Sequence, residues 1–569
     1  MKNPSHMNVV LCFALMALGV PTVVAVEDGW HRGDKGVGVQ EIIRDWPLRQ
    51  PDQPVLVAVM DSGYDTDHPR LAPAIWHNPA EAAGTAGADD DGNGFVDDVH
   101  GWSFLQSTDG EQLIQARMEV TRLYAIMSEE VAAGTRSEDD PEWKKVSRHF
   151  ERSRRQWERR MLSAYMGMAA KEVAERDLEA AGVDPSQFNE VDPDSLTEPR
   201  ARVAASILKD QQVAYMAGFF ATAEEFLQYG YNPNFSESAV LADDPSDPSA
   251  QGYGGAQLSV GSRDKHGTMV AGVIGAVGDN DDPLAGISPW VKLVLVRSTP
   301  DGDERDKDVA NGVRYAVACG ARIINMSFGK PYSPQKDWVD AAMQEAADAG
   351  VLMVAAAGND AVDIAEDIHY PSRDYSVDGV TKRFPNWLVV GASAYGDQIA
   401  RFSNYGDEEV DFLAPGVDIS AISADGGTDL ADGTSFAAPV ASGVAALLWS
   451  QFPDATVEQI RAAMLAGARP VEHKVTRPGG RKEVTLDQLV ITGGVLDARR
   501  ALAALAHAQG DESIIPEAWR YEQWATGGTA DSEAATEAGQ EATDPAQAVE
   551  ASGQAGDPAE QAPELETVP

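Results

Sequence analysis

Four residues that could together cut an amide bond stand at the ends of short apolar runs. In chain order they are Asp61, His266, Asn359 and Ser435. A serine hydroxyl becomes a nucleophile when an imidazole accepts its proton, and a carboxylate holds that imidazole in the right tautomer. An asparagine amide and the backbone N–H of the serine can donate to the oxygen that becomes negative during the attack. These residue types in this order therefore favour acyl transfer, with Ser435 as the nucleophile and His266 as the base.

The segments around these residues predict the elements that must position them. Residues 55–60 and 351–358 are continuous apolar runs, each followed by a polar candidate residue, as in buried parallel strands. His266 and Ser435 each precede a run of small apolar residues, which predicts a buried helix at each place. Open α/β sheets hold their functional residues at the carboxyl ends of the strands. We therefore expect the four side chains to meet at one edge of a sheet.

These motifs resemble those of the subtilisin-like serine peptidases (subtilases). The resemblance runs from about Val55 to Ala506 with one long interruption, and beyond the four segments it includes VRYAVACGARIINMSFG (313–329), APG (414–416) and GGVLDARRALAAL (493–505). It implies an α/β fold with a doubly wound, mostly parallel sheet and helices on both faces. It also implies a serine-type endopeptidase that acts on protein or peptide substrates through an acyl-enzyme intermediate.

By the same resemblance, Asp61 orients His266, which acts as general base and then as acid. The oxyanion is bound by Asn359 and the backbone of Ser435, and the chemistry requires no cofactor. An extended substrate backbone would pair with Ser327, Phe328 and Gly329. The segment 301–313 would flank the cleft on the N-terminal side of the scissile bond, where basic substrate residues would be favoured by Asp301, Asp303, Glu304 and Asp306.

The composition limits the classes of partner. The chain of 569 residues carries 45 Lys and Arg against 90 Asp and Glu, a formal net charge of −45. Such acidity argues against nucleic acid and anionic membranes as partners. The N-terminal apolar run is too short for a transmembrane anchor and no other run approaches the required length, so stable membrane insertion is not expected. The oligomeric state is left open. Cys12 and Cys319 are the two cysteines, so a disulfide scaffold is excluded.

The chain divides by composition and motif into five parts. The first has a basic start, an apolar run and a small-residue cleavage site at Val23-Val24-Ala25, which predicts a signal peptide and a secreted or periplasmic protein. The last is acidic and of low complexity, which is typical of a disordered tail. The predicted parts are a signal peptide (1–25), the first part of the catalytic domain (26–104), a helical insertion (105–250), the second part of the catalytic domain (251–510) and the tail (511–569).

The insertion separates Asp61 from His266 and breaks the α/β alternation. Its pattern predicts helices over 111–132, from Asp140-Pro141 onward, and over about 197–228. One interpretation is a helical hairpin or bundle packed on the catalytic domain. Another is a lid that restricts access to Ser435. The whole chain also admits a second function, an inactive subtilase-fold scaffold that binds partners through this insertion, although none of the triad residues is missing.

A calcium site is predicted in the acidic run 89–98. Oxygen-bearing side chains at alternate positions, with Gly94 at the sharp turn, match the first half of a calcium loop. The ligands would include Asp89, Asp91, Asn93 and Asp97, and the resemblance to subtilases supports a structural Ca²⁺ here. His100 stands where a calcium loop would have its bidentate Glu, so a further ligand must come from elsewhere. An Asx-rich turn without metal is the alternative.

Overall fold

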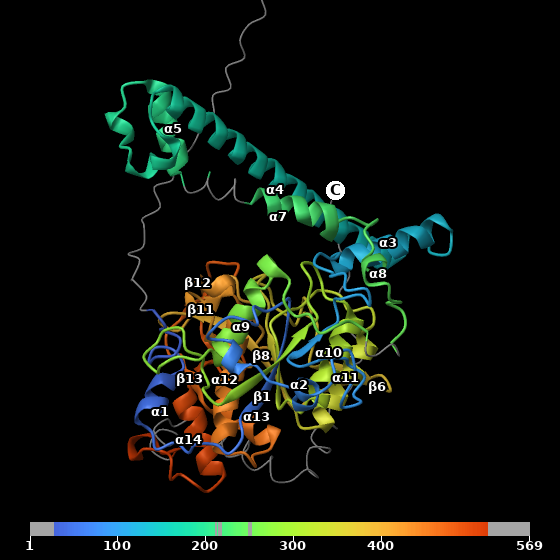
Figure 1. The fold of residues 1–569 in the computed structure, drawn as a ribbon, viewed down its shortest axis with the longest axis vertical. Helices are drawn as coiled ribbons and strands as arrows, with labels where there is room; N and C mark the ends of the chain where they lie inside the picture. Colours follow the sequence, from blue (N-terminus) through green and yellow to red (C-terminus); the bar gives the residue numbers. More distant parts are fainter. Residues whose placement is uncertain (1–27, 211–212, 214–218, 249–252, 522–569) are drawn as a thin grey trace, which may run out of the picture.

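The computed structural model describes residues 28–210, 213, 219–248 and 253–521 (Figure 1). The predicted signal peptide (1–25) lies outside the described residues, and so does the tail from residue 522 onward. Among the helices of the described part, none combines the length and the hydropathy that crossing a bilayer requires.

A ten-stranded sheet forms the centre of the molecule (Figure 1), in the order β13-β16-β10-β8-β5-β4-β1-β3-β2, with β9 beside β8. Neighbours from β16 to β2 are parallel, whereas β13 and β9 pair antiparallel with β16 and β8. The strands are β1 (Val55–Asp61), β2 (Gly101–Ser103), β3 (Val291–Arg297), β4 (Ile323–Met326), β5 (Leu352–Ala356), β8 (Trp387–Ala394), β9 (Gln398–Ile399), β10 (Phe412–Pro415), β13 (Ala468–Pro470) and β16 (Gly494–Leu496). Among the described residues, three hairpins lie outside the sheet: β6 (Asp374–Val377) with β7 (Val380–Arg383), β11 (Ile419–Ser423) with β12 (Gly427–Ala431), and β14 (Val475–Thr476) with β15 (Glu483–Val484).

Helices cover both faces of the sheet and bury one apolar core on each. Along β1, Val57 and Val59 point into one core and Ala58 and Met60 into the other, because successive side chains of a strand alternate. The first core is shared with α1 (Val39–Asp45), α9 (Lys265–Gly275), α12 (Thr434–Gln451), α13 (Val457–Ala466) and α14 (Ala498–Ala508), and the second with α10 (Asp306–Ala318) and α11 (Lys336–Asp348). The predicted fold class, a doubly wound, mostly parallel sheet with helices on both faces, is confirmed.

The insertion between Asp61 and His266 is mainly helical, as predicted. Its elements are α3 (Glu119–Ala132), α4 (Pro141–Ala180), α5 (Pro199–Lys209), α7 (Phe220–Glu225), the π-helical turn Phe226–Gly230 and α8 (Glu237–Leu241). The predicted start of the long helix is confirmed, because Asp140 caps it by accepting a hydrogen bond from the N–H of Trp143 at 2.8 Å. The prediction of one helix over 197–228 is wrong, because Asp210 adopts an extended conformation that ends α5 at Lys209.

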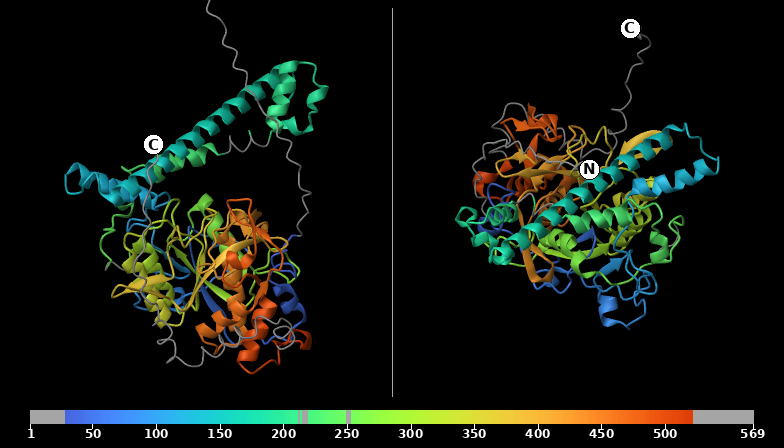
Figure 2. Two further views of the ribbon diagram at one scale, coloured as in Figure 1. Left: turned by 180° about the vertical axis from the view of Figure 1, so that it is seen from behind. Right: turned by 90° about the horizontal axis from the view of Figure 1, so that it is seen from above.

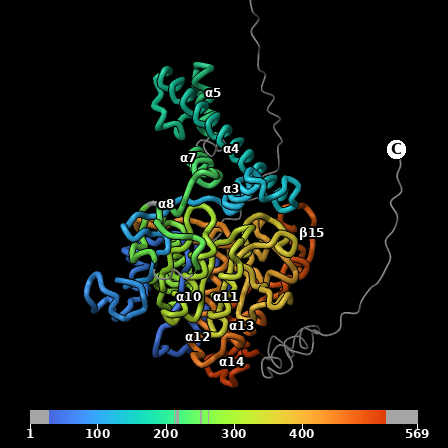
Figure 3. The backbone as a smooth tube through the Cα atoms, turned by 90° about the vertical axis from the view of Figure 1, so that its right-hand side faces the viewer, coloured from blue at the N-terminus to red at the C-terminus, as the bar shows by residue number. Residues whose placement is uncertain are grey.

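The helices of the insertion form an arm that stands over one side of the sheet body (Figures 1 and 2). The 40-residue α4 packs on α3 and α7 near the body and on α5 at its far end. It also contacts the body through His149, whose Nδ1 lies 2.9 Å from the hydroxyl of Tyr332. Turning the molecule by 90° shows the same separation between the sheet body and α5 (Figure 3).

Candidate active site

The predicted site residues lie at the carboxyl edge of the parallel sheet and at the helix starts beside it. Asp61 is the last residue of β1, and residues 327–329 follow the end of β4 directly. Asn359 stands three residues after β5. His266 and Ser435 are each the second residue of a helix, α9 and α12 respectively. Since the strands are parallel, their carboxyl ends share one edge of the sheet.

Asp61 and His266 are joined directly. The Nδ1 atom of His266 lies 2.8 Å and 3.0 Å from the two carboxylate oxygens of Asp61, whose residue is only 2% exposed. Burial alone would lower the pKa of His266, but the charge and hydrogen bond of Asp61, with the charge of Asp301, outweigh burial and raise it. The His266 side chain remains 41% exposed, so its other ring nitrogen is available for proton transfer.

A glycine permits this close approach of α9 to the end of β1. A Cβ atom on Gly267 would lie 2.2 Å from the carbonyl oxygen of Gly63 and 3.2 Å from the Cβ of Asp61. The first of these distances is shorter than any tolerated contact, so a larger residue would push His266 away from Asp61. The Gly next to the histidine is therefore part of what sets the distance between the imidazole and the carboxylate.

Ser435 lies in the first turn of α12, where unpaired N–H groups favour developing negative charge. Its hydroxyl donates to the carbonyl oxygen of Ser327 at 3.1 Å, and the Ser327 hydroxyl donates to the carbonyl oxygen of Ser435 at 2.8 Å. Within the described residues Ser435 makes no hydrogen bond to His266. The next residue, Phe436, stacks obliquely near the imidazole with ring centroids 5.6 Å apart. A rotation about χ1 of Ser435 is therefore the change that would bring nucleophile and base together.

Two nitrogen atoms, the backbone N of Ser435 and Nδ2 of Asn359, border one space beside Gly433. The side-chain oxygen of Asn359 accepts from the N–H and the hydroxyl of Thr434, at 2.9 Å and 3.0 Å, which fixes the orientation of the amide. A Cβ on Gly433 would lie 3.6 Å from the backbone nitrogen of Ser435 and 3.7 Å from Nδ2 of Asn359. With a φ of 151°, Gly433 puts no side chain into this space, which is bordered by both nitrogens and, at 3.6 Å, by Cδ2 of Phe436.

His369 is a site residue that the sequence did not reveal. A Cβ on Gly329 would lie 2.1 Å from Nε2 of His369, and one on Gly358 would lie 3.0 Å from its Cε1. The imidazole therefore fills the space between the ends of β4 and β5, next to Asn359. Burial lowers its pKa, although the charge of Asp360 opposes this, so the ring is neutral at neutral pH. No local pattern around His369 marks it, because its position depends on a loop that folds back from further along the chain.

A second carboxylate, Asp301, lies near His266 and is tied to the insertion. Arg263 forms an ion pair with Asp301, and its other terminal nitrogen lies 2.6 Å from Oε1 of Glu225 in α7. Burial raises the pKa of Asp301 and so does the charge of Glu225, whereas Arg263 lowers it. The charge near the imidazole thus depends in part on a residue of the insertion.

The acidic loop brings together a different set of oxygens from the one expected. Carboxylate oxygens of Glu81, Asp89 and Asp91 lie within 4.8 Å of one another among the described residues. Glu81 was not predicted, because it comes from α2 (Pro79–Ala83), before the loop. Asp97 borders this group through its backbone, because its N–H donates to Oε2 of Glu81 at 3.0 Å, whereas its own Oδ2 accepts from the N–H of Gly87 at 2.8 Å. Asn93 donates to Asp91 at 3.2 Å. An all-oxygen donor set of this kind fits a hard cation such as Ca²⁺.

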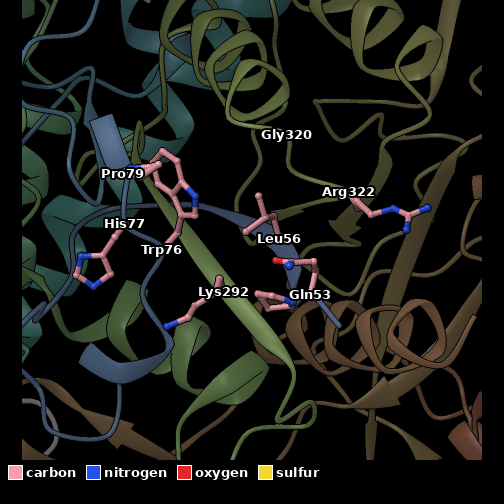
Figure 4. Close-up of a pocket in the computed structure, with 9 residues that line it drawn as sticks. Gln53, Leu56, Trp76, His77, Pro79, Lys292, Gly320 and Arg322 are labelled. Carbon is pink, nitrogen blue, oxygen red and sulfur yellow. The ribbon is translucent and has the colours of Figure 1, made fainter. Parts of the chain in front are cut away.

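A cavity of about 530 Å³ lies at the opposite, amino-terminal end of the strands (Figure 4). Its lining includes Leu56 and Lys292, the second residues of β1 and β3, and Arg322, which directly precedes β4. The Lys292 ammonium donates to the carbonyl oxygen of Pro73 at 2.6 Å, and Arg322 donates to that of Pro453 at 2.7 Å. These cations are already bound by the protein's own carbonyls, and the cavity takes no part in the site.

Comparison with known proteins agrees with the site. Residues 52–488 match the model of the subtilase family. Subtilisin amylosacchariticus of Bacillus subtilis subsp. amylosacchariticus is 33% identical over 197 residues, which cover 34% of this chain and 48% of that protein. Subtilisin BL of Lederbergia lenta is 33% identical over 218 residues, covering 38% of this chain and 71% of that protein. The match thus spans about half the length of the first of these relatives.

Solved structures also show similarity. The protease domain of PatA, in a mutant form, is 30% identical with a TM-score of 0.35, covering 44% of this chain and 83% of that one. A cold adapted subtilisin-like serine proteinase is 30% identical with a TM-score of 0.33, covering 42% of this chain and 77% of that one.

Proposed function

The chain belongs to the subtilase family, and from that premise we propose that it is a serine endopeptidase acting on protein or peptide substrates. The observation that carries the proposal is the Asp61–His266 pair, 2.8 Å apart, beside the first turn of the helix that holds Ser435. In this proposal Ser435 rotates away from Ser327 and gives its proton to Nε2 of His266 as its oxygen attacks the substrate carbonyl carbon.

The remaining groups have roles that follow from their positions. The carbonyl oxygen becomes negative and is stabilised by Nδ2 of Asn359 and the N–H of Ser435, which face the space beside Gly433. His266 then protonates the leaving amine, and the C–N bond breaks to give an ester between Ser435 and the acyl group. Water, deprotonated by His266, attacks that ester, and the serine recovers its proton as the acid leaves. Asp61 keeps the imidazole oriented and stabilises its charged form throughout.

The test uses an unfolded protein substrate and a fluorophosphonate probe, which bonds covalently to activated serines. We expect the full chain to cleave the substrate and to be labelled, and we expect Ser435→Ala to do neither. Ser376→Ala, at an exposed position in β6, is the matched control and should behave as the wild type. A wild type that folds but neither cleaves nor reacts would instead support the scaffold function, in which the insertion binds a partner.

Export is a second part of the proposal. The basic start, the apolar run and the cleavage pattern Val23-Val24-Ala25 support a secreted or periplasmic location. Expression in a bacterial host, followed by fractionation and N-terminal sequencing, tests it. A mature protein outside the cytoplasm that begins close to Val26 is the expected result, and a full-length protein retained in the cytoplasm would contradict it.

A structural Ca²⁺ in the acidic loop is a third part. Glu81, Asp89 and Asp91 would hold the ion, with chemistry limited to neutralising their charges and stiffening the loop. We expect a chelator to lower the melting temperature of the wild type by a few degrees, and added Ca²⁺ to restore it. The same treatments should leave Asp91→Ala unchanged, and equal chelator effects on both proteins would contradict the site.

A further inference from the structure

Two lengths of backbone run from the site toward Lys330. The first is Ser327–Gly329, which begins beside Ser435. The second is 301–304, which begins close to Asp61, since the N–H of Thr299 donates to the Asp61 carbonyl at 3.2 Å. The two come together at their far ends, where the Lys330 ammonium donates to the carbonyl oxygen of Glu304 at 2.7 Å.

The first length presents its free backbone groups to the second. Lys330 exchanges both backbone hydrogen bonds with Tyr370, at 2.9 Å and 2.8 Å. Because successive residues of an extended chain direct their backbone groups to opposite sides, Gly329 faces away from Tyr370, on the same side as Ser327. The Ser327 carbonyl accepts from Ser435, which identifies that side as the side of the nucleophile. Within the described residues Gly329 makes no backbone hydrogen bond, so it is free to pair with a substrate.

The second length is held on its outer side by the insertion. Asp301 donates its N–H to the Ile114 carbonyl at 2.7 Å and accepts from the N–H of Ala116 at 2.8 Å, and the N–H of Asp303 donates to the Arg117 carbonyl at 3.3 Å. Gly302 follows the paired residue at a bend with a φ of 135°, and beyond it the carbonyl of Glu304 points toward Lys330, whose ammonium lies 2.7 Å away. An extended substrate segment would lie between this length and Gly329.

The far end of this space is closed by a buried ionic group, here called the Lys330 cluster (Lys330, Glu119, Asp306, Arg122 and the carbonyl of Glu304). The ammonium lies 2.8 Å from a carboxylate oxygen of Glu119 and 2.7 Å from one of Asp306, in addition to its bond to the Glu304 carbonyl. Arg122 is 2.8 Å from Glu119. The Lys330 side chain is 1% exposed and all three of its N–H donors are used.

We propose that the substrate groove of this chain ends three residues upstream of the scissile bond. The three positions lie opposite Ser327, Phe328 and Gly329, and the next position meets the Lys330 cluster, where the Glu304 carbonyl is already occupied. A fourth upstream residue thus meets the Lys330 ammonium where it would need a free Glu304 carbonyl, and it turns into solvent. The inference rests on the proposed function for the direction of the substrate, and it gives the insertion a defined part in recognition, because α3 supplies Glu119 and Arg122.

Burial of the acidic residues in 301–306 changes which substrate side chains the groove is expected to favour. Asp303, Glu304 and Asp306 are each 5% exposed or less. Burial raises the pKa of Glu304 to about 8, the opposing charge of Lys330 notwithstanding, so this carboxyl is mostly neutral at neutral pH. The sequence-based expectation that these acids favour basic substrate residues therefore loses three of its four carboxylates.

Binding to the full-length Ser435→Ala variant tests the proposal without turnover. The probes are acetylated peptides with identical downstream residues and two, three, four or five upstream residues, each with a fluorescent label at the C-terminus. We expect the affinity measured by anisotropy to rise up to three upstream residues and then to change by less than about twofold. A gain of about tenfold at the fourth residue, the size expected of a pair of backbone hydrogen bonds, would overturn the proposal.

Removing the Lys330 side chain provides the second measurement. In Ser435→Ala with Lys330→Ala, the fourth upstream residue should gain affinity by about tenfold, while Lys336→Ala in α11 serves as the matched lysine control and should keep the wild-type pattern. A thermal melt establishes that each variant is folded. A length dependence unchanged by Lys330→Ala would show that another group ends the groove. Cleavage by the wild type is scored separately, so a protein that binds with the expected length limit but never cleaves refutes the proposed function alone.

Discussion

The Asp61–His266 pair and the Lys330 cluster are both ionic groups beside the same groove. They differ in whether a hydrogen-bonding nitrogen remains unpaired. One ring nitrogen of His266 is bound to Asp61, and the side chain is 41% exposed, so the second ring nitrogen can exchange a proton with a neighbour. Lys330 is 1% exposed and has no donor to spare. A charged group that is exposed in a groove and has an unpaired donor or acceptor can take part in a reaction. A buried charged group whose donors are all paired instead determines the shape of the groove.

Removing the charge of Asp61 should give the largest effect on activity. Asp61→Asn keeps the size of the side chain but no longer imposes the tautomer or stabilises the imidazolium, so kcat should fall by about 10⁴. Steady-state kinetics on a chromogenic peptide measure it. Asp67→Asn, an exposed neighbour, should retain wild-type kcat. A loss below about tenfold for Asp61→Asn would show that the pair is not part of the chemistry.

Lys330→Met tests the same comparison through the stability of the protein instead of its activity. The change leaves Glu119 and Asp306 buried without their cation, and we expect the free energy of unfolding to fall by about 3–5 kcal/mol. Lys144, whose ammonium lies 2.7 Å from Asp139 in an exposed pair, offers the control, and Lys144→Met should cost less than about 1 kcal/mol. Equal losses in denaturant unfolding would show that burial does not distinguish the two lysines.

The space between the ends of β4 and β5, which His369 fills, offers a test of intermediate size. His369→Gly would open the space between Gly329 and Gly358, so substrates with a large apolar residue before the scissile bond should improve by about tenfold or more in kcat/KM. Substrates with alanine there should change little. His369→Gln, which keeps most of the volume, should retain the wild-type preference. If large residues gained nothing in His369→Gly, the imidazole would not line this position.

The smallest expected effect is a shift in the pH profile. His266 must be neutral to act as a base, and its pKa is raised by Asp61 and also by Asp301, so the acidic limb of kcat/KM lies above the ordinary histidine pKa. Asp301→Asn removes one raising charge, and the limb should move to lower pH. Measuring kcat/KM from pH 5 to 9 tests this, with Asp67→Asn as control. A limb that moved to higher pH would contradict the assignment.

The sequence predicts those parts of the fold and site that depend on local pattern. The strand ending at Asp61 and the helices starting beside His266 and Ser435 are each specified within about ten residues. Their apolar runs determine burial, and the polar residue at the end determines what reaches the sheet edge. The start of α4 at Pro141 was predicted for the same reason, since cap and first turn are contiguous in the chain.

The features that could not be predicted depend on contacts between distant segments. Lys330 and Glu119 are 211 positions apart, and neither stands in a pattern that marks it. Glu81 joins the acidic loop from a preceding helix, and His369 reaches the site from a later loop. The end of α5 was not predicted because no Gly or Pro stands near Lys209 to mark it, and the extended conformation of Asp210 has no signal in the sequence. The spacing of apolar residues predicts helices and strands, but it does not predict which side chains of separate elements come into contact.

The insertion leaves and rejoins the body at neighbouring points, since Ser103 and Gly255 exchange hydrogen bonds at 2.8 Å and 3.0 Å. This has a kinetic consequence. Asp61 and His266 are 205 residues apart, and closing so long a loop directly is entropically costly. Once residues 103 and 255 pair, connections of 42 and 11 residues replace that loop, and the effective contact order of the site falls. Assembly of the arm before the site would therefore accelerate folding of the whole chain.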